Sequence, residues 1–296
     1  MSASVGDHAD SRAAFSLDGS FWRRAARWGA RGPEWFVRVT PPVVGVVVCA
    51  LAPAPRKAIA DNLRRIRGSR GALRDAADVA RTFATYAACL TEVLGGQPPR
   101  SHAVIKGELH MEDAIAEGKG IVVVTAHTAG WEVVGPLLAR DRHLDMTIVE
   151  AAEPDAAASA IQDEARRAMG IRVAHVGDDP LSALPLAKHL RGGGVVALQI
   201  DRTPPGLRTR AVTLFGQPAG VPEGPLRLAS LTGAPIVPVF VARTGHRRYE
   251  IVASAPIRLD REPSEAALDA AAQEMASRLE AFVRAHPTQW FHFRSA

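Results

Sequence analysis

Short apolar runs recur along the middle and later parts of the chain and predict buried β-strands. The first covers 121–124 and follows the polar stretch 117–120. A run this short, bounded by turn-forming residues, is typical of a strand that is buried on both faces. Similar runs stand at 146–149, 173–176, 195–199, 236–241 and 249–253. Because stretches with helical spacing separate them, the pattern predicts a mixed α/β sheet flanked by helices on both faces.

Upstream of these runs, residues 56–94 carry the pattern of two helices. Gly68 and Gly71 interrupt it, so we expect the first helix to end and the second to begin there. In the second helix, small and apolar residues recur at helical spacing and predict its buried face. These residues are Leu73, Ala76, Ala77, Ala80, Phe83, Ala84, Ala87 and Leu90. The glycines at 192–194 predict a turn rather than a phosphate-binding loop.

An uncharged segment covers residues 39–55, and two prolines at each end bracket its apolar centre at 43–52. A helix needs about 20 apolar residues to span the hydrocarbon of a bilayer. The centre is shorter than that, so we expect it to dip into one leaflet rather than to cross. Residues 1–17 are polar and lack the apolar region of a signal peptide. We therefore expect the protein at the cytoplasmic face of the inner membrane, in a peripheral or monotopic arrangement.

Positive charge concentrates in the same part of the chain. Residues 21–74 hold twelve Arg and Lys residues against two acidic ones, a net charge of about +10 in a chain whose total is +5. Trp22, Trp28 and Trp35 are interleaved with these arginines. Indoles at headgroup depth and guanidiniums on lipid phosphates suit an anionic membrane surface. The alternative is an amphipathic helix packed on its own domain, while the lack of any recognition motif disfavours a nucleic-acid partner.

These patterns divide the chain into a flexible tail at 1–20, a helical, basic membrane-associating segment at 21–75, and a folded domain at 76–296. Hydrophobic residues make up 47% of the chain and aromatic residues 5%, which predicts an aliphatic core and excludes disordered, collagen-like and coiled-coil classes. Two cysteines, Cys49 and Cys89, cannot build a disulfide framework or a thiolate metal site. We expect no metal site and no cysteine nucleophile.

The candidate chemistry rests on one histidine. The sequence lacks the motifs of serine hydrolases, zincins, P-loop proteins and dinucleotide-binding proteins. His127 follows the run at 121–124, at the strand end where α/β sheets bind ligands. Glu132 lies about one helical turn further on, where it can accept a hydrogen bond from one ring nitrogen and raise the basicity of the other. This predicts a general base. The alternative is a histidine that only satisfies backbone groups at the strand end.

His127-x4-Glu132 resembles the H-x4-D/E signature of glycerolipid and lipid A acyltransferases. The chain from about residue 35 to 294 resembles the lipid A late acyltransferase family, which includes phosphatidylinositol mannoside acyltransferases. The matching segments are the R-x5-N-L stretch at 56–63, the second acidic motif at 198–202, the F-G segment at 212–219, P-E-G-P at 222–225, L-A-S-L-T-G-A-P-I-V-P at 228–238 and H-P-T-Q-W at 286–290. The resemblance implies a glycerolipid acyltransferase-like fold, with 76–296 as the acyltransferase domain.

The resemblance also implies roles for further residues. Asp201 would orient the base or the acceptor, and Arg202 would face the developing oxyanion or a donor phosphate; a salt-bridged loop is the alternative. Arg166, or Arg167 in its place, would match a family arginine. Small residues at 126, 129 and 130 would let a substrate approach, and Trp131 with its neighbours would line a groove for the acyl chain. The substrate-binding residues expected in this way are Gly130, Trp131, Arg166, Phe215, Gly216 and Gly224.

The implied reaction moves a fatty acyl group from a carrier thioester to a hydroxyl, or less readily an amine, of a lipid or glycolipid. The donor would be an acylated acyl carrier protein or an acyl-coenzyme A, so no bound cofactor is expected. His127 would take the proton of the acceptor as it attacks the thioester carbonyl. Two alternatives stay open: a non-catalytic module that binds lipid or acyl carrier, and a hydrolase of acyl thioesters.

Overall fold

The computed structural model describes residues 20–94, 102–132, 135, 144–151, 160, 163–164, 166–167, 170–176, 183–203 and 206–293. The tail expected at 1–20 lies outside these residues except for Ser20. The side chains expected beside Trp131 in the acyl groove, at 133, 134, 137 and 138, also lie outside them.

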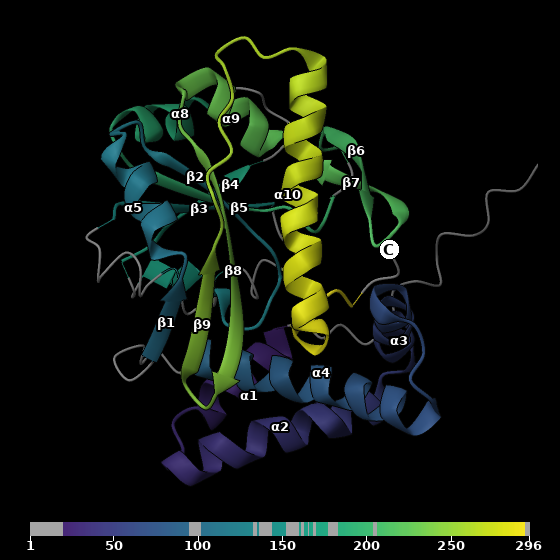
Figure 1. Ribbon diagram of the computed structural model, residues 1–296. Helices are drawn as coiled ribbons and strands as arrows, with labels where there is room; N and C mark the ends of the chain where they lie inside the picture. Colours follow the sequence, from purple (N-terminus) through teal and green to yellow (C-terminus); the bar gives the residue numbers. More distant parts are fainter. Residues whose placement is uncertain are drawn as a thin grey trace, which may run out of the picture.

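A seven-stranded sheet forms the centre of the molecule (Figure 1). Its order is β1-β9-β8-β2-β5-β3-β4, and every neighbouring pair is parallel except β8 with β9. The strands are β1 (His102–Lys106), β2 (Ile121–Thr125), β3 (Met146–Ala151), β4 (Arg172–Val176), β5 (Val195–Gln199), β8 (Ile236–Gly245) and β9 (Arg248–Ala253). Six of the seven were predicted. The unpredicted edge strand β1 is only half-buried, and its apolar run is limited to the three residues 103–105.

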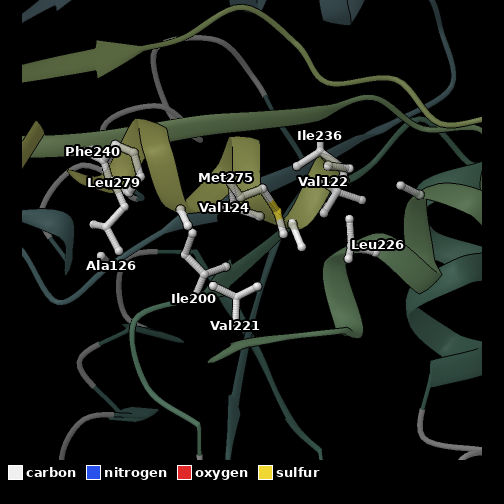
Figure 2. Packing of buried hydrophobic residues seen from close by; sticks show 14 of the residues in the cluster. Val122, Val124, Ala126, Ile200, Val221, Leu226, Ile236, Phe240, Met275 and Leu279 are labelled. Carbon is white, nitrogen blue, oxygen red and sulfur yellow. The ribbon is translucent and has the colours of Figure 1, made fainter. Parts of the chain in front are cut away.

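Strand β2 lies inside the sheet between β5 and β8, and all five of its residues are buried. Successive side chains of a strand point to opposite faces, so β2 contributes to two cores. Val122 and Val124 pack with Met275 and Leu279 on one face, as Figure 2 shows. Ile121 and Val123 belong to a second cluster on the other face. The mixed sheet with helices on both faces is therefore confirmed.

Helices supply the outer layers. On the side of Val122 lie α8 (Ala183–Arg191), α9 (Gly224–Thr232) and α10 (Glu265–Ala285), and on the side of Ile121 lie α5 (Glu108–Ala116) and the end of α4 (Ala72–Leu94). A short 3-10 helix, η3 (Pro287–Gln289), follows α10. The predicted turn at 192–194 is confirmed, because it joins α8 to β5.

The two predicted helices in 56–94 are α3 (Pro53–Arg67) and α4, and they are separated at Gly68–Gly71 as expected. The predicted buried face of α4 is wrong at its start. Leu73 is 89% exposed, and Ala76 and Ala77 are exposed as well. Polar contacts hold this end of the helix instead, since Arg67 pairs with Asp78 at 2.5 Å. The division expected between residues 75 and 76 falls inside α4 and stays a prediction.

The N-terminal part is helical, as expected, with α1 (Ser20–Gly29) and α2 (Glu34–Leu51). Pro41 and Pro42 lie inside α2 instead of bracketing the apolar segment. The apolar helix is therefore 18 residues long, with a mean hydropathy of 1.5, and by length and composition alone it would reach across a membrane. This corrects the expectation that the segment is too short. In the structure α2 packs along α4, at the lower edge of the molecule in Figure 1.

A two-stranded antiparallel hairpin, β6 (Thr209–Leu214) and β7 (Gln217–Pro222), stands apart from the main sheet and runs beside α10 (Figure 1). Arg210 near the start of β6 pairs with Glu265 and Asp269 at the start of α10, both at 2.7 Å. The backbone N–H of Phe215, at the hairpin turn, donates to the carboxylate of Glu280 near the other end of α10. The hairpin therefore follows the length of α10 and carries its turn toward the C-terminal segment of the chain.

Candidate active site

His127 and Asp201 are 74 positions apart in the chain but lie side by side at one edge of the sheet. His127 follows β2, and Asp201 follows the neighbouring strand β5. Parallel neighbours end at the same edge of a sheet, so residues that follow them come together there. The backbone N–H of Ile200 donates to the carbonyl of Thr125 at 2.9 Å and extends the pairing up to the site.

The His127 ring is held by Asp201. Its Nδ1 lies 2.9 Å from Oδ1 of Asp201, and the backbone N–H of His127 donates to both carboxylate oxygens at 3.2 Å. An ionised carboxylate can only accept hydrogen bonds, so in the neutral ring Nδ1 carries the proton and Nε2 keeps its lone pair. The His127 side chain is 22% exposed, whereas that of Asp201 is fully buried. Asp201 therefore fixes the Nδ1 side of the ring, and Nε2 is the nitrogen that can still accept a proton.

Asp201 is stabilised as a carboxylate in spite of its burial. Burial alone would raise its pKa, but the charge and hydrogen bond of His127, the charge of Arg202 and the N–H of Trp290 together hold the pKa well below its ordinary value. The indole Nε1–H of Trp290 donates to Oδ2 at 2.9 Å. Both carboxylate oxygens are therefore engaged, and the orientation of Asp201 is fixed.

Glu132 does not occupy the position on the His127 ring that the sequence predicts. Its carboxylate lies 3.3 Å from Nη2 of Arg166, whose Nη1 binds Glu150. Burial raises the pKa of Glu132, an effect that the charge of Arg166 partly offsets. Nδ1 of His127 binds Asp201, while the charge of His127 still acts on Glu132, so a role of Glu132 at the base stays a prediction. Glu132 instead belongs to a buried charge cluster beside His127.

Arg166, rather than its neighbour Arg167, is the buried arginine of this region. Its side chain is 1% exposed, whereas Arg167 is exposed. The guanidinium lies 5.5 Å from the centre of the half-buried Trp131 ring as well as against Glu132 and Glu150. The structure thus brings Arg166 and Trp131 together beside Glu132. Their contacts are those of residues that position Glu132, and substrate binding by either stays a prediction.

Arg202 lies at the site with part of its hydrogen-bonding capacity unused. Its Nη2 donates to the backbone carbonyl of Phe291 at 2.9 Å. Its Nε is buried and has no hydrogen-bond partner among the described residues. A buried N–H without a partner is costly and marks a place where a bound group can supply the missing acceptor.

The small residues after β2 are closely packed. Gly130 has a φ of 85°, and a Cβ placed on it would lie 2.3 Å from the ring of Tyr249. Ala126 and Ala129 are fully buried. The loop that carries His127 is therefore pressed against β8 and β9, and a role of Gly130 in substrate binding stays a prediction.

The F-G segment forms the turn of the β6–β7 hairpin. Phe215 and Gly216 have φ values of 52° and 72°, as a two-residue turn with both residues in the left-handed region requires. The Phe215 ring lies 5.6 Å from that of Trp290, which connects it to Asp201. Gly216 faces open space and serves the turn. Gly224 is the exposed first residue of α9, so no contact of either glycine reaches His127.

The C-terminal segment contributes site residues to which the sequence analysis gave no role. Trp290 holds Asp201, and the backbone N–H of Phe291 donates to the carbonyl of His127 at 2.7 Å. The Gln289 carbonyl accepts from the N–H of Ala129 at 3.0 Å, and Thr128 pairs with Trp290 as an isolated bridge. The H-P-T-Q-W match was the available signal, but a motif match does not say what a side chain touches.

Among the described residues, no cluster of three or more His, Cys, Asp or Glu side chains could hold a metal ion. The described side chains at this edge of the sheet include an oriented imidazole, its buried carboxylate and a neighbouring guanidinium.

The chain matches the bacterial lipid A biosynthesis acyltransferase family over residues 33–295. It is 30% identical over 191 residues to a phosphatidylinositol mannoside acyltransferase of Mycobacterium tuberculosis, a stretch covering 63% of this chain and 57% of that protein. The protein of the same name from Mycolicibacterium smegmatis is 26% identical over 189 residues, covering 61% and 58%. The match thus spans less than two thirds of the length of these relatives.

Among solved structures, the 1-acyl-sn-glycerophosphate acyltransferase PlsC of Thermotoga maritima is 15% identical, over 76% of this chain and 87% of that one. Its TM-score of 0.39 is too low to identify a shared fold. The family match is stronger evidence than this structural likeness, because it covers nearly the whole described chain and includes every segment that forms the site. The chain belongs to the bacterial lipid A biosynthesis acyltransferase family.

Proposed function

We propose that this protein transfers a fatty acyl group from a carrier thioester to a hydroxyl of a lipid or glycolipid, with His127 as the general base. The observation that carries the proposal is the 2.9 Å contact between Nδ1 of His127 and the buried carboxylate of Asp201. It leaves Nε2 as the nitrogen that can accept a proton. Membership in an acyltransferase family supports the reaction class.

In this reaction Nε2 of His127 takes the proton of the acceptor hydroxyl while its oxygen attacks the thioester carbonyl. The tetrahedral intermediate then collapses to the ester and expels the carrier thiolate. The imidazolium of His127 gives its proton to this thiolate, so the carrier leaves as a free thiol. Asp201 orients the ring and stabilises the imidazolium, the role that the sequence predicts for Glu132. General-base help contributes about 10²- to 10⁴-fold, so positioning and charge stabilisation supply the rest of the acceleration.

Arg202 is the candidate for stabilising the negative charge that develops on the carbonyl oxygen. Its buried Nε–H lacks an acceptor among the described residues, and the residue next to it in the chain binds the base. A preorganised cation beside a developing oxyanion acts without reorganising in the transition state. The same N–H can instead donate to a phosphate of the acyl donor. Kinetics of Arg202→Lys separate the two roles: a lower kcat indicates oxyanion stabilisation, and a higher KM of the donor indicates phosphate binding.

The substrates belong to the proposal. The donor is an acylated acyl carrier protein or an acyl-coenzyme A, and the acceptor is a hydroxyl-bearing lipid at the cytoplasmic face of the membrane. The name of the mycobacterial relatives supports a glycolipid acceptor. A basic N-terminal segment of about +10 supports work at an anionic surface, where such acceptors are found.

The test is to incubate the full chain with each acyl donor, labelled in the acyl group, together with a membrane lipid extract. Labelled lipid supports a transferase, free fatty acid indicates a thioester hydrolase, and neither product indicates a module that only binds. His127→Ala should reduce lipid labelling about 100-fold or more. The matched control is His189→Ala, because the His189 ring also lies near an aspartate, Asp145 at 3.9 Å, but Asp145 precedes β3, at the edge of the sheet opposite to that of His127. Equal loss in both variants would contradict the assignment.

A further inference from the structure

Helix α2 has one apolar face that is buried against α4 and another that is exposed to solvent. One face packs on α4 and recurs every three or four residues through Val37, Pro41, Gly45 and Val48, all buried. The opposite face is open to solvent along the whole helix. Its exposed members are Trp35, Val39, Val43, Val44, Val46, Val47 and Leu51. Among the described residues, nine of the fifteen exposed large apolar side chains lie between 21 and 51, so this is a patch rather than scattered exposure.

The packed face of α2 is in direct backbone contact with α4. A Cβ placed on Gly45 would lie 2.4 Å from the carbonyl oxygen of Phe83 and 2.8 Å from Cα of Ala84. Two helices approach this closely only where a glycine removes the side chain between them. The contact fixes α2 along α4, and α4 exposes Arg74 and Arg81, which cannot enter hydrocarbon at low cost.

Both ends of α2 are tied to the same body. At its start, Glu34 pairs with Arg247 at 3.0 Å and with His246 at 2.8 Å, both at the turn between β8 and β9. At its end, Nη1 of Arg56 in α3 donates to the carbonyls of Cys49 and Ala50 at 3.0 and 2.8 Å. A helix that crosses a bilayer places its ends on opposite sides of about 30 Å of hydrocarbon. Here both ends stay with the domain that carries His127.

The rim of the patch has the composition of a headgroup layer. Trp28 is 75% exposed and Trp35 is 68% exposed, and the exposed residues Arg24, Arg31 and Arg38 stand among them in the chain. Indoles settle at the interface and guanidiniums bind lipid phosphates. The positive charge therefore complements an anionic leaflet beside a surface that is apolar at its centre.

We infer that α2 lies in the plane of the membrane, with its exposed valine face in one leaflet and the exposed residues Arg24, Trp28, Arg31, Trp35 and Arg38 at the headgroups. It does not span the bilayer, although its length and composition would permit that. The inference rests on the proposed function only in that the acceptor is a membrane lipid. It places the domain that carries His127 on the same side of the membrane as both ends of α2.

The first test measures depth. Single cysteines introduced by Val39→Cys, Val43→Cys and Val47→Cys, in a chain with Cys49→Ala and Cys89→Ala, are labelled with a fluorophore on anionic phosphatidylglycerol vesicles. Quenchers placed at known depths in the lipid should report one shallow depth for all three positions. A deep label at position 43 between shallow ends, or a label at position 47 that is quenched only from the vesicle lumen, would overturn the inference.

The second test keeps the native cysteines and measures vesicle binding first, with turnover as a separate control. Val43→Glu and Val47→Glu should each weaken co-sedimentation with the same vesicles at least 10-fold, while the matched controls Leu184→Glu and Leu231→Glu, exposed on α8 and α9, should leave it within twofold. Turnover of a detergent-dispersed acceptor should stay unchanged in all four, which separates this inference from the proposed function. Unchanged vesicle binding, or a wild-type dimer that Val43→Glu converts to a monomer without affecting vesicle binding, would overturn it.

Discussion

The indole N–H of Trp290 donates to Oδ2 of Asp201 at 2.9 Å, and Oδ1 of the same carboxylate binds Nδ1 of His127. Trp290 in turn packs against Phe215 at the turn of the β6–β7 hairpin, with ring centres 5.6 Å apart. Four segments that are far apart in the sequence therefore meet in one chain of contacts. This arrangement makes Trp290 and Phe215 positioning residues for the base, since each acts on His127 through Asp201.

Trp290→Phe removes the N–H but keeps an aromatic ring against Phe215. A hydrogen bond to a charged group contributes about 1.5–3 kcal/mol, so we expect kcat to fall about 10-fold or more if Asp201 loses its orientation. The KM of the acceptor should change little, and circular dichroism should show the wild-type folded fraction, so that the fall in kcat does not come from unfolded enzyme. Steady-state kinetics at saturating donor measures both. A kcat within twofold of wild type would mean that Asp201 is held without Trp290.

Gly130→Ala should destabilise the protein by about 2–4 kcal/mol, because the new methyl group meets the ring of Tyr249 and the backbone has a positive φ. Gly216→Ala is the matched control. Gly216 also has a positive φ, but its Cβ would point into open space, so we expect a cost of about 1 kcal/mol. Urea unfolding of the two variants measures the difference. Equal losses of unfolding free energy in the two variants would show that the contact with Tyr249 does not restrict the residue at position 130.

Neither cysteine should be needed for turnover. Burial raises the pKa of Cys89 to about 12, with Glu92 adding to the effect, and burial also raises the pKa of Cys49. Both therefore remain thiols near neutral pH and are poor nucleophiles. Cys49→Ala and Cys89→Ala should each keep at least half of the wild-type rate, and no acylated enzyme should be seen by mass spectrometry. An acyl group trapped on either sulfur would contradict direct transfer.

The lowered pKa of Asp201 predicts how stability depends on acid. A carboxyl group whose pKa is lower in the folded than in the unfolded state stabilises folding above its unfolded pKa of about 3.9, and this contribution is lost as the pH falls toward the folded value. Wild type should therefore lose stability relative to Asp201→Asn between about pH 5 and pH 3. Urea titrations at the two pH values test this. If wild type instead gained stability relative to Asp201→Asn toward pH 3, the pKa of Asp201 would be raised rather than lowered in the folded state.

The inner strands of the sheet were predictable because they are buried on both faces and so appear as unbroken apolar runs, as at 121–124. Strand β1 escaped prediction because it is an edge strand with alternating exposure. The prolines in α2 and the exposed start of α4 had no local signal either. Pro41 is tolerated inside α2, and Leu73 stays exposed at the start of α4. Both outcomes depend on tertiary context.

The site was predictable in its residues more than in its pairings. His127 was expected there because it follows an apolar run, and Asp201 because its segment resembles the second acidic motif of the family. Which carboxylate reaches the ring depends on the order of strands in the sheet, because β5 rather than the helix after β2 brings the acid to Nδ1. The sequence contains no direct record of strand order. Trp290 was missed for the same reason, since its contact with Asp201 spans 89 positions.

The central claim is that Asp201, rather than Glu132, orients His127 as the base. The most direct measurement is the rate of acyl transfer by Asp201→Asn and Glu132→Gln at saturating donor and acceptor, with folding checked by thermal unfolding. An amide at 201 can donate to Nδ1 and so place the proton on Nε2, where it blocks proton uptake. We predict a fall of about 10²- to 10⁴-fold for Asp201→Asn and a smaller fall for Glu132→Gln. A rate for Asp201→Asn within threefold of wild type, or a larger loss in Glu132→Gln, would contradict the account.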